Sequence, residues 1–254
     1  MHIILTGATG LVGSAALAAL LPLLLPAGPI TRLTILTRRP VPMAEKAANP
    51  AIRTIIHKDY ASYPPELLAE LKGASGIIWA LGISQREVSA SDYVKITKDY
   101  TLAAADVFKD LNGEKGVNFV YVSGEGATTS PGRFTPLFGK VKGETEAALL
   151  AIHNSHPQFR PYNARAGAVD PSGHKEVVEA GTWERKGAML KIGDAVLLPA
   201  IKGLYKGMHS PTPELGRALV KLAMGDGAPV AAGTGVDGEG RTLSNIALRR
   251  IVGL

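Results

Sequence analysis

The chain has 254 residues, of which 46% are hydrophobic and 20% are charged, and this composition is ordinary for a globular protein. It excludes an intrinsically disordered chain, and the 29 glycines and 17 prolines follow no short period that would indicate a collagen-like one. The absence of cysteine excludes disulfides and thiolate chemistry. The net charge is +6, but the basic residues are scattered, so we expect no nucleic-acid partner.

The most apolar segment near the N-terminus, Ala15 to Leu25, is too short to span a bilayer and contains Pro22. It follows a glycine-rich turn rather than a basic segment, which is not the pattern of a signal peptide. We therefore expect a soluble, cytoplasmic protein with no membrane partner. We predict no metal site, because His153 and His156 have no third ligand nearby in the sequence. The sequence does not indicate an oligomeric state.

Short apolar runs alternate with longer segments of helical spacing over the first two thirds of the chain. The strand-like runs are His2–Leu5, Leu33–Leu36, Ile52–Ile56, Gly76–Ala80 and Val117–Val122. The helical segments between and after them are Leu11–Leu21, Asp92–Leu111 and Leu137–His153. This alternation predicts an α/β fold with a Rossmann-type, doubly wound parallel sheet and crossover helices.

The rhythm breaks after Arg165. Residues 170–212 have no clear strand period, and we predict that they form a small, irregular cap over the carboxyl edge of the sheet, where ligands of such sheets bind. Closing helices are predicted over Pro213–Met224 and Leu243–Val252. We expect a single domain over residues 1–254, with a dinucleotide-binding core (1–170) and a substrate cap with closing helices (171–254). Four residues of the irregular region are predicted either to line an apolar pocket or to be ordinary core residues: Trp183, Met189, Tyr205 and Met208.

A glycine-rich turn, Thr6-Gly7-Ala8-Thr9-Gly10-Leu11-Val12-Gly13, joins the first predicted strand to the first predicted helix. Its three glycines permit a tight turn, a close approach of the backbone to a pyrophosphate, and close packing of the helix on the strand. The N–H groups and the dipole of a helix start also favour phosphate. An ordinary tight turn is the alternative, but the context predicts a dinucleotide site formed by Gly7, Thr9, Gly10, Leu11, Val12 and Gly13.

The end of the second predicted strand carries Thr37-Arg38-Arg39, where an NAD site usually has an acidic residue. Two guanidinium groups can bind a 2′-phosphate through paired hydrogen bonds, whereas a carboxylate would repel it. This favours NADP(H) as the cofactor, with two exposed loop arginines as the alternative. Asp59, just after the third strand, is a candidate partner for the adenine amino group or a solvated loop residue.

Further motifs follow the later strands. They are Ala80-Leu81-Gly82, Val122-Ser123-Gly124, Phe138-Gly-Lys-Val-Lys142-Gly-Glu and Arg165-Ala-Gly-Ala-Val-Asp170-Pro. With these and the GATGLVG turn, residues 1–170 resemble the atypical short-chain dehydrogenase/reductases, which have NAD(P)-binding Rossmann folds, and in particular their NmrA-like and epimerase-like relatives in fungi.

The resemblance implies roles for several residues. The loop Ala80, Leu81 and Gly82 would lie along the cofactor, and Ser123 would face the substrate. Lys142 would bind the nicotinamide ribose. The loop after the sixth strand, at Gly167 and Ala168, would cover the nicotinamide amide through its backbone.

One departure from the family pattern concerns the catalytic tyrosine, which the family places four residues before the lysine. This chain has Phe138 there, on the same helix face as Lys142. Phenylalanine cannot donate the proton that ketone reduction needs, and loss of such an acid costs about 10²–10⁴ in rate. Standard ketone reduction is therefore not expected.

Three explanations remain open. In the first, the substrate is an imine or iminium, which needs no proton after hydride addition. Asp170, expected at the end of the sixth strand, would stabilise the cation, and Arg133, in the Pro131–Pro136 loop after the fifth strand, would orient an anionic or carbonyl group. Alternatively another donor replaces the tyrosine, with Ser123, Thr135 or water as candidates. In the third explanation the protein is a non-catalytic NADP(H)-sensing regulator or binding module; a cyclase using the same pocket is a related possibility.

We predict an NADPH-dependent reductase of a small organic substrate, an imine, iminium or activated carbonyl from secondary metabolism. The predicted catalytic residues are Asp170, Arg133, Ser123 and Lys142.

Overall fold

The computed structural model describes residues 1–24, 26–179 and 205–254. Its centre is an eight-stranded sheet with the strand order β3-β2-β1-β4-β5-β6-β10-β9, in which β9 alone is antiparallel. The predicted α/β class with a Rossmann-type parallel sheet is confirmed. The strands are β1 (His2–Thr6), β2 (Arg32–Thr37), β3 (Ile52–Ile56), β4 (Gly76–Trp79), β5 (Val117–Gly124), β6 (Phe159–Ala166), β9 (Val236–Asp237) and β10 (Thr242–Leu243).

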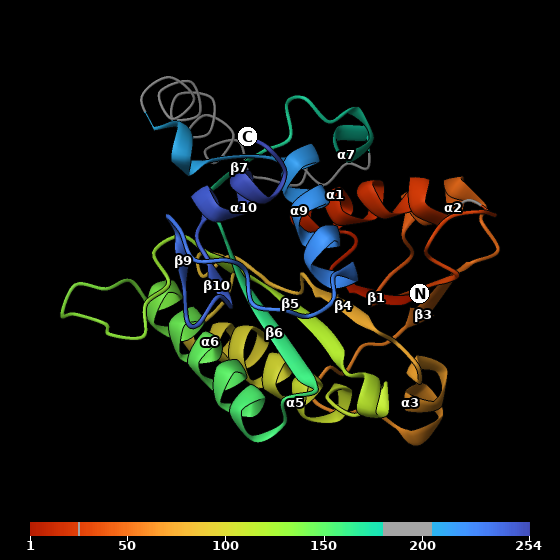
Figure 1. The fold of residues 1–254 in the computed structure, drawn as a ribbon, viewed down its shortest axis with the longest axis horizontal. Coiled ribbons are helices and arrows are strands. Elements are labelled where there is room, and N and C mark those ends of the chain that lie inside the picture. The colour runs from red at the N-terminus through yellow and green to blue at the C-terminus, as the bar shows by residue number, and fades with distance from the viewer. Residues whose placement is uncertain (25, 180–204) are drawn as a thin grey trace.

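Helices cover both faces of the sheet (Figure 1). One face packs against α1 (Leu11–Leu20), the 3-10 turn η1 (Leu21–Leu24), α2 (Pro42–Ala47), α9 (Thr212–Met224) and α10 (Asn245–Ile251). The other packs against α3 (Pro65–Leu71), α5 (Tyr100–Phe108) and α6 (Leu137–Ser155). Short segments complete the described part: α4 (Ala90–Val94), η2 (Lys95–Asp99), η3 (Gly113–Lys115), α7 (Lys175–Glu179) and η4 (Lys206–Met208). No helix in these ranges is long and apolar enough to cross a membrane.

The continuous apolar runs of the central strands reflect burial on both faces. In β1, Ile3 and Leu5 belong to the core under α1 and α9, whereas Ile4 between them belongs to the core under α5 and α6. Successive side chains of a strand point to opposite faces, so a strand covered on both sides is apolar throughout. The sheet register places Thr6 beside Leu36 and Trp79, so the segments that follow these three strands begin at one edge.

Two predicted regions differ from the structure. The helix predicted over Asp92–Leu111 consists of α4, the π-helical segment η2 and α5, because a π-helical turn widens the helix in its middle. Residues 170–212 were predicted to be irregular, but one strand ends at residue 170 and another lies within their described part. These are β7 (Ala168–Asp170) and β8 (His209–Pro211), which pair in parallel as a separate two-stranded sheet. Trp183 and Met189 lie outside the described residues.

The main sheet and its core extend beyond residue 170. Strand β10 pairs with β6, and α9 and α10 contribute Leu219 and Leu248 to the core that also contains Leu17 of α1. The region after residue 170 therefore includes elements that complete the main sheet and its core.

Helices α1 and α9 approach each other closely because small residues face each other at their contact. A Cβ atom added at Gly216 of α9 would lie 2.4 Å from the carbonyl oxygen of Ala15 in α1. Both residues are buried, so neither helix can yield without disturbing the core.

We therefore expect Gly216→Ala to lower the free energy of unfolding by about 1–3 kcal/mol, the usual cost of overpacking a core. Chemical denaturation measures this change. The matched control is Gly173→Ala, where an added Cβ meets no atom within 4 Å. An equal loss of stability in both variants would contradict the close helix contact.

Candidate active site

A cleft of about 950 Å³ opens at the carboxyl edge of β1, β2, β4, β5 and β6. Ligands of open α/β sheets bind at this edge, and the volume is at the upper end of small-molecule sites. The structure brings together, as lining residues of this cleft, the following predicted site residues: Thr9, Gly10, Leu11, Val12, Arg38, Arg39, Ala80, Leu81, Gly82, Ser123, Lys142 and Gly167.

The turn after β1 depends on glycine at two positions. Gly7 has φ +67°, and an added Cβ would lie 2.1 Å from the carbonyl oxygen of Ala80. At Gly13 an added Cβ would lie 2.0 Å from the carbonyl oxygen of Gly7. These two glycines do not line the cleft, but they let the turn pack against β4 and against α1. As a result, the first residues of α1 form one wall of the cleft.

The N-terminus of α1 has no capping side chain. Gly10 is its N-cap residue and has no side chain that could cap the helix, and no acidic residue lies in the first turn. The first N–H groups of a helix have no partner within the helix. They form an electropositive end that favours an anion such as a phosphate.

Two arginines extend this electropositive wall. Thr37, the last residue of β2, is buried, and its hydroxyl donates to the carbonyl oxygen of Arg39 at 2.7 Å, which fixes the turn. Arg39 Nε donates to Thr9 Oγ1 at 3.2 Å, so the second strand's loop is tied to the first turn. Arg38 and Arg39 are both exposed to solvent and line the cleft. Thr37 itself does not line it.

Helix α6 forms the opposite wall with Phe138 and Lys142. Lys142 Nζ donates to the carbonyl oxygen of Val122 at 3.2 Å and lies 6.0 Å from the centre of the Tyr121 ring. Burial lowers the pKa of Lys142 to about 8, although the carboxylate of Glu146 favours its charged form. The backbone N–H of Phe138 donates to Gln85 Oε1 at 2.9 Å, which anchors the start of the helix.

A buried charge network lies behind this wall. Glu146 is one turn after Lys142, and its side chain is 1% exposed. Its carboxylate accepts from Arg165 Nε at 3.0 Å and Nη2 at 2.5 Å, and from the hydroxyl of Ser123 at 2.5 Å. The hydrogen bond from Arg165 to Glu146 raises the pKa of the guanidinium. Ser123 and Arg165 are paired neighbours on β5 and β6, so the two strands fix this geometry.

Sequence reasoning missed several residues of the cleft. Glu125 lines it and accepts from the backbone N–H of Asn245 at 2.5 Å. Thr97 reaches it from the π-helical turn, and Tyr121 from β5. The spacing of Glu125, two residues after Ser123, and of Glu146, four after Lys142, could have indicated both carboxylates.

Several predicted residues lie outside this cleft. Asp59 is exposed, and its carboxylate accepts from the backbone N–H of Ala61 in a local turn. Ala168 belongs to β7 and is not among the described residues that line the cleft. Thr135 Oγ1 accepts from the backbone N–H of Gly132 within its own loop.

The placement of Asp170 differs from the prediction. It was expected at the end of the sixth strand, but β6 ends at Ala166 and Asp170 ends β7, in the separate small sheet. Asp170 is buried, and its carboxylate makes hydrogen bonds with His209 Nε2 at 2.8 Å and the backbone N–H of Ser172 at 3.0 Å. Asp170 is thus not among the described residues that line the cleft, although the preceding Val169 is, and its carboxylate links β7 to β8.

Arg133 is also away from the cleft. It is exposed in the loop between β5 and α6, which extends from the body at the left of Figure 1. The predicted role of Arg133 requires its side chain to reach a substrate in the cleft. The loop instead projects outward, so that Phe134 beside Arg133 is 92% exposed.

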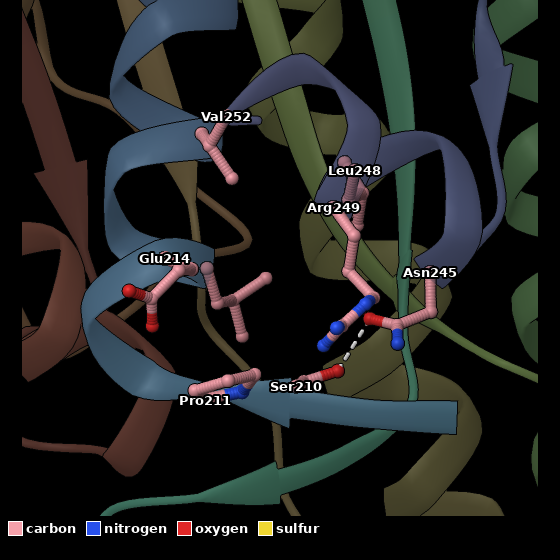
Figure 2. Close-up of a pocket in the computed structure, with 8 residues that line it drawn as sticks. Ser210, Pro211, Glu214, Asn245, Leu248, Arg249 and Val252 are labelled. Atoms are coloured by element: carbon pink, nitrogen blue, oxygen red, sulfur yellow. Dashed lines mark hydrogen bonds between the residues drawn. The ribbon is translucent and has the colours of Figure 1, made fainter. Parts of the chain in front are cut away.

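The cleft residue Gly167 is held in place by hydrogen bonds that connect it with β8 and α10. The hydroxyl of Ser210 accepts from the backbone N–H of Gly167 and donates to Asn245 Oδ1, the bond drawn in Figure 2. The amide of Asn245 donates to the carbonyl oxygens of Gly207 and His209. The hollow beside these hydrogen bonds holds only about 10 Å³, space for about one water molecule. The hydrogen bonds of Asn245 to Gly207 and His209 position Met208 between them, and Met208 lines the cleft. Tyr205 is exposed.

Comparison with known proteins gives both close and distant likenesses, although no family profile matches the chain. Leucinostatins biosynthesis cluster protein T from Purpureocillium lilacinum is 33% identical over 269 aligned positions, covering 98% of this chain and 94% of that protein. Botcinic acid biosynthesis cluster B protein 16 from Botryotinia fuckeliana is 44% identical over 147 positions, covering 57% of this chain and 90% of that protein.

Among solved structures, a short-chain dehydrogenase/reductase from Saccharomyces cerevisiae, YIR035C, has a TM-score of 0.65 at 16% identity and covers 99% of both chains. DesIV, a dTDP-glucose 4,6-dehydratase from Streptomyces venezuelae solved with NAD and TYD bound, has a TM-score of 0.60 at 20% identity, covering 88% of this chain and 72% of that one. The narrower resemblance to NmrA-like proteins stays a prediction. The chain has the fold of the short-chain dehydrogenase/reductases and belongs to the same family as leucinostatins biosynthesis cluster protein T.

Proposed function

We propose that this protein is an NADPH-dependent reductase of a small organic substrate with an imine, iminium or activated carbonyl group. One observation carries the proposal: a single cleft has an uncapped helix N-terminus with two arginines on one wall, and Lys142 with Ser123 on the other. The first wall fits the phosphates of a dinucleotide, and the second fits its reactive end and a substrate.

The residues present fit NADP(H). The close backbone contacts at Gly7 and Gly13 leave no room for side chains there and bring the N–H groups of α1 to the cleft. These groups would hold the pyrophosphate. Arg38 and Arg39 would hold the 2′-phosphate, since each guanidinium can form paired hydrogen bonds with it.

The chemistry at the other end is limited by the lack of an acid at Phe138. If bound, NADPH would supply a hydride to the substrate carbon, and the electron pair of an iminium C=N bond would move to nitrogen, so that the products would be a neutral amine and NADP⁺. No proton is consumed in that reaction. Tyr121 is a poor substitute acid, because burial raises the pKa of its hydroxyl.

The names of the two fungal relatives connect them with biosynthesis clusters. This supports a substrate from secondary metabolism for the present chain as well. A non-catalytic protein that senses NADP(H), or a cyclase using the same pocket, would also fit the missing acid, and turnover distinguishes these functions from a reductase.

The direct test is NADPH oxidation by the purified protein against a panel of cyclic imines, iminium salts, 1,2-diketones and simple ketones. We expect turnover with members of the first three classes and rates at least about 100-fold lower with simple ketones, in line with the loss of an acid. Absorbance of NADPH and identification of the reduced product measure this. Stoichiometric binding with no oxidation across the panel would contradict the reductase and favour the sensor.

A second prediction concerns cofactor choice. Replacing Arg38 and Arg39 together by alanine should raise the Kd for NADPH at least about tenfold, because a hydrogen bond to a charged group contributes about 1.5–3 kcal/mol. The Kd for NADH should change less than about twofold. Calorimetric titration measures both constants. Arg53→Ala is the control, since Arg53 of β3 pairs with Glu70 of α3 and does not line the cleft. Equal weakening of both nucleotides would count against a 2′-phosphate site.

A third prediction uses the lowered pKa of Lys142. In the free protein its ammonium loses its proton as the pH rises through about 8, so affinity for the anionic NADP⁺ should fall between about pH 7 and about pH 9. Lys142→Met should bind more weakly and lose this dependence. Lys140→Met, on the same helix, should keep it. A wild-type affinity that is constant over the range would refute the assignment.

A further inference from the structure

The network behind the substrate wall decides which hydrogen bonds Ser123 can offer. Glu146 is almost completely buried and forms a two-point contact with Arg165, which holds it as a carboxylate. An ionised carboxylate accepts hydrogen bonds but has no proton to donate. In the bond between Ser123 and Glu146, the serine must therefore be the donor.

A hydroxyl has one proton and two lone pairs. Because its hydroxyl donates its proton in the hydrogen bond to Glu146, Ser123 presents only lone pairs to the cleft that it lines. A substrate carbonyl oxygen is also only an acceptor, so it would have to take the proton away from a buried carboxylate. A substrate N–H group would bind the lone pair with no such conflict.

The same side of the cleft carries a second acceptor. Glu125, two residues after Ser123, lines the cleft, and one of its carboxylate oxygens accepts from the backbone N–H of Asn245. The neighbouring lining residues Phe138, Val169 and Met208 are apolar and offer no donor. Thr97 and Tyr121 also line the cleft, but Thr97 is buried and so is the hydroxyl oxygen of Tyr121. The charged donor here is Lys142, which the proposed function assigns to the ribose of the cofactor.

We infer that Glu146, held by Arg165, acts as a positioning residue that makes Ser123 an acceptor, so that Ser123 and Glu125 together select a substrate whose reacting nitrogen is a cation bearing N–H. The substrate class is then a protonated imine that bears N–H, and the product is the corresponding amine. This inference rests on the proposed function and narrows it, since it excludes carbonyl compounds as the preferred substrates.

Binding of a matched pair of probes tests the inference without turnover. The probes are 2-phenylpyrrolidine, which is protonated at neutral pH, and 2-phenyltetrahydrofuran, which has the same shape but only an acceptor oxygen. We expect the wild-type protein to bind the amine at least about tenfold more tightly than the ether, the usual effect of one charge-assisted hydrogen bond. Calorimetric titration is carried out with NADP⁺ present and also with the free protein.

Glu146→Gln gives the decisive comparison. The amide can donate to Ser123, which frees the serine proton for the cleft, so amine affinity should fall and ether affinity should rise or stay constant. Ser123→Ala should lose amine affinity and leave ether affinity unchanged, and it provides the same test if Glu146→Gln does not fold. Glu144→Gln is the matched control, because Glu144 is an exposed residue of the same helix that pairs with Lys98. It should behave as wild type.

Two results would overturn the inference: equal or absent binding of the two probes by the wild-type protein, or a loss of both affinities in the same proportion in Glu146→Gln and Ser123→Ala. The second result would mean that the network is only structural. Failure of NADP⁺ to bind would instead refute the proposed cofactor, and the titrations of the free protein would still decide whether the cleft prefers the amine.

Discussion

The close backbone contact between the first turn and the fourth strand is the constraint on which the site depends. The carbonyl oxygen of Ala80 occupies the space that a side chain at Gly7 would need, and the carbonyl of Gly7 does the same at Gly13. This packing brings the uncapped start of α1 to the carboxyl edge of the sheet, beside the end of β2. Helix dipole, free N–H groups and two guanidiniums then act on the same region of space.

The part of the cleft lined by Ser123 and Lys142 depends on a second constraint, the pairing of β5 with β6. Their register sets Ser123 beside Arg165, and α6 crosses behind them so that Glu146 contacts both. A charged pair buried in this way has to be fully hydrogen-bonded to be tolerated, and the serine proton contributes to that. The hydrogen bonds that Ser123 can offer to the cleft therefore follow from the way in which the buried carboxylate of Glu146 is satisfied.

Local chemistry explains which expectations from the sequence agree with the structure. These expectations depend only on residues a few positions apart in the sequence. They concern the apolar runs of β1, β4 and β5, the glycines of the first turn, and the spacing of Phe138 and Lys142. The strand–turn–helix order then fixes the sheet edge at which they lie. By contrast, the predicted role of Asp170 required knowing where the sixth strand ends. The chain leaves the main sheet at Gly167, where the carbonyl of Met208 lies so close that only glycine fits, and Asp170 pairs with His209 instead.

The sequence by itself determined the alternation of strands and helices over the first two thirds of the chain, the glycine-rich turn after the first strand, and the absence of a hydroxyl at position 138, because each of these depends on residue type and short spacing. Only the tertiary structure decided that Glu146 binds both Ser123 and Arg165, that Glu125 reaches the cleft, and that Arg133 and Asp170 do not line it. Those contacts join segments that are distant in the sequence, and their geometry is set by strand register and helix packing, which no local pattern encodes.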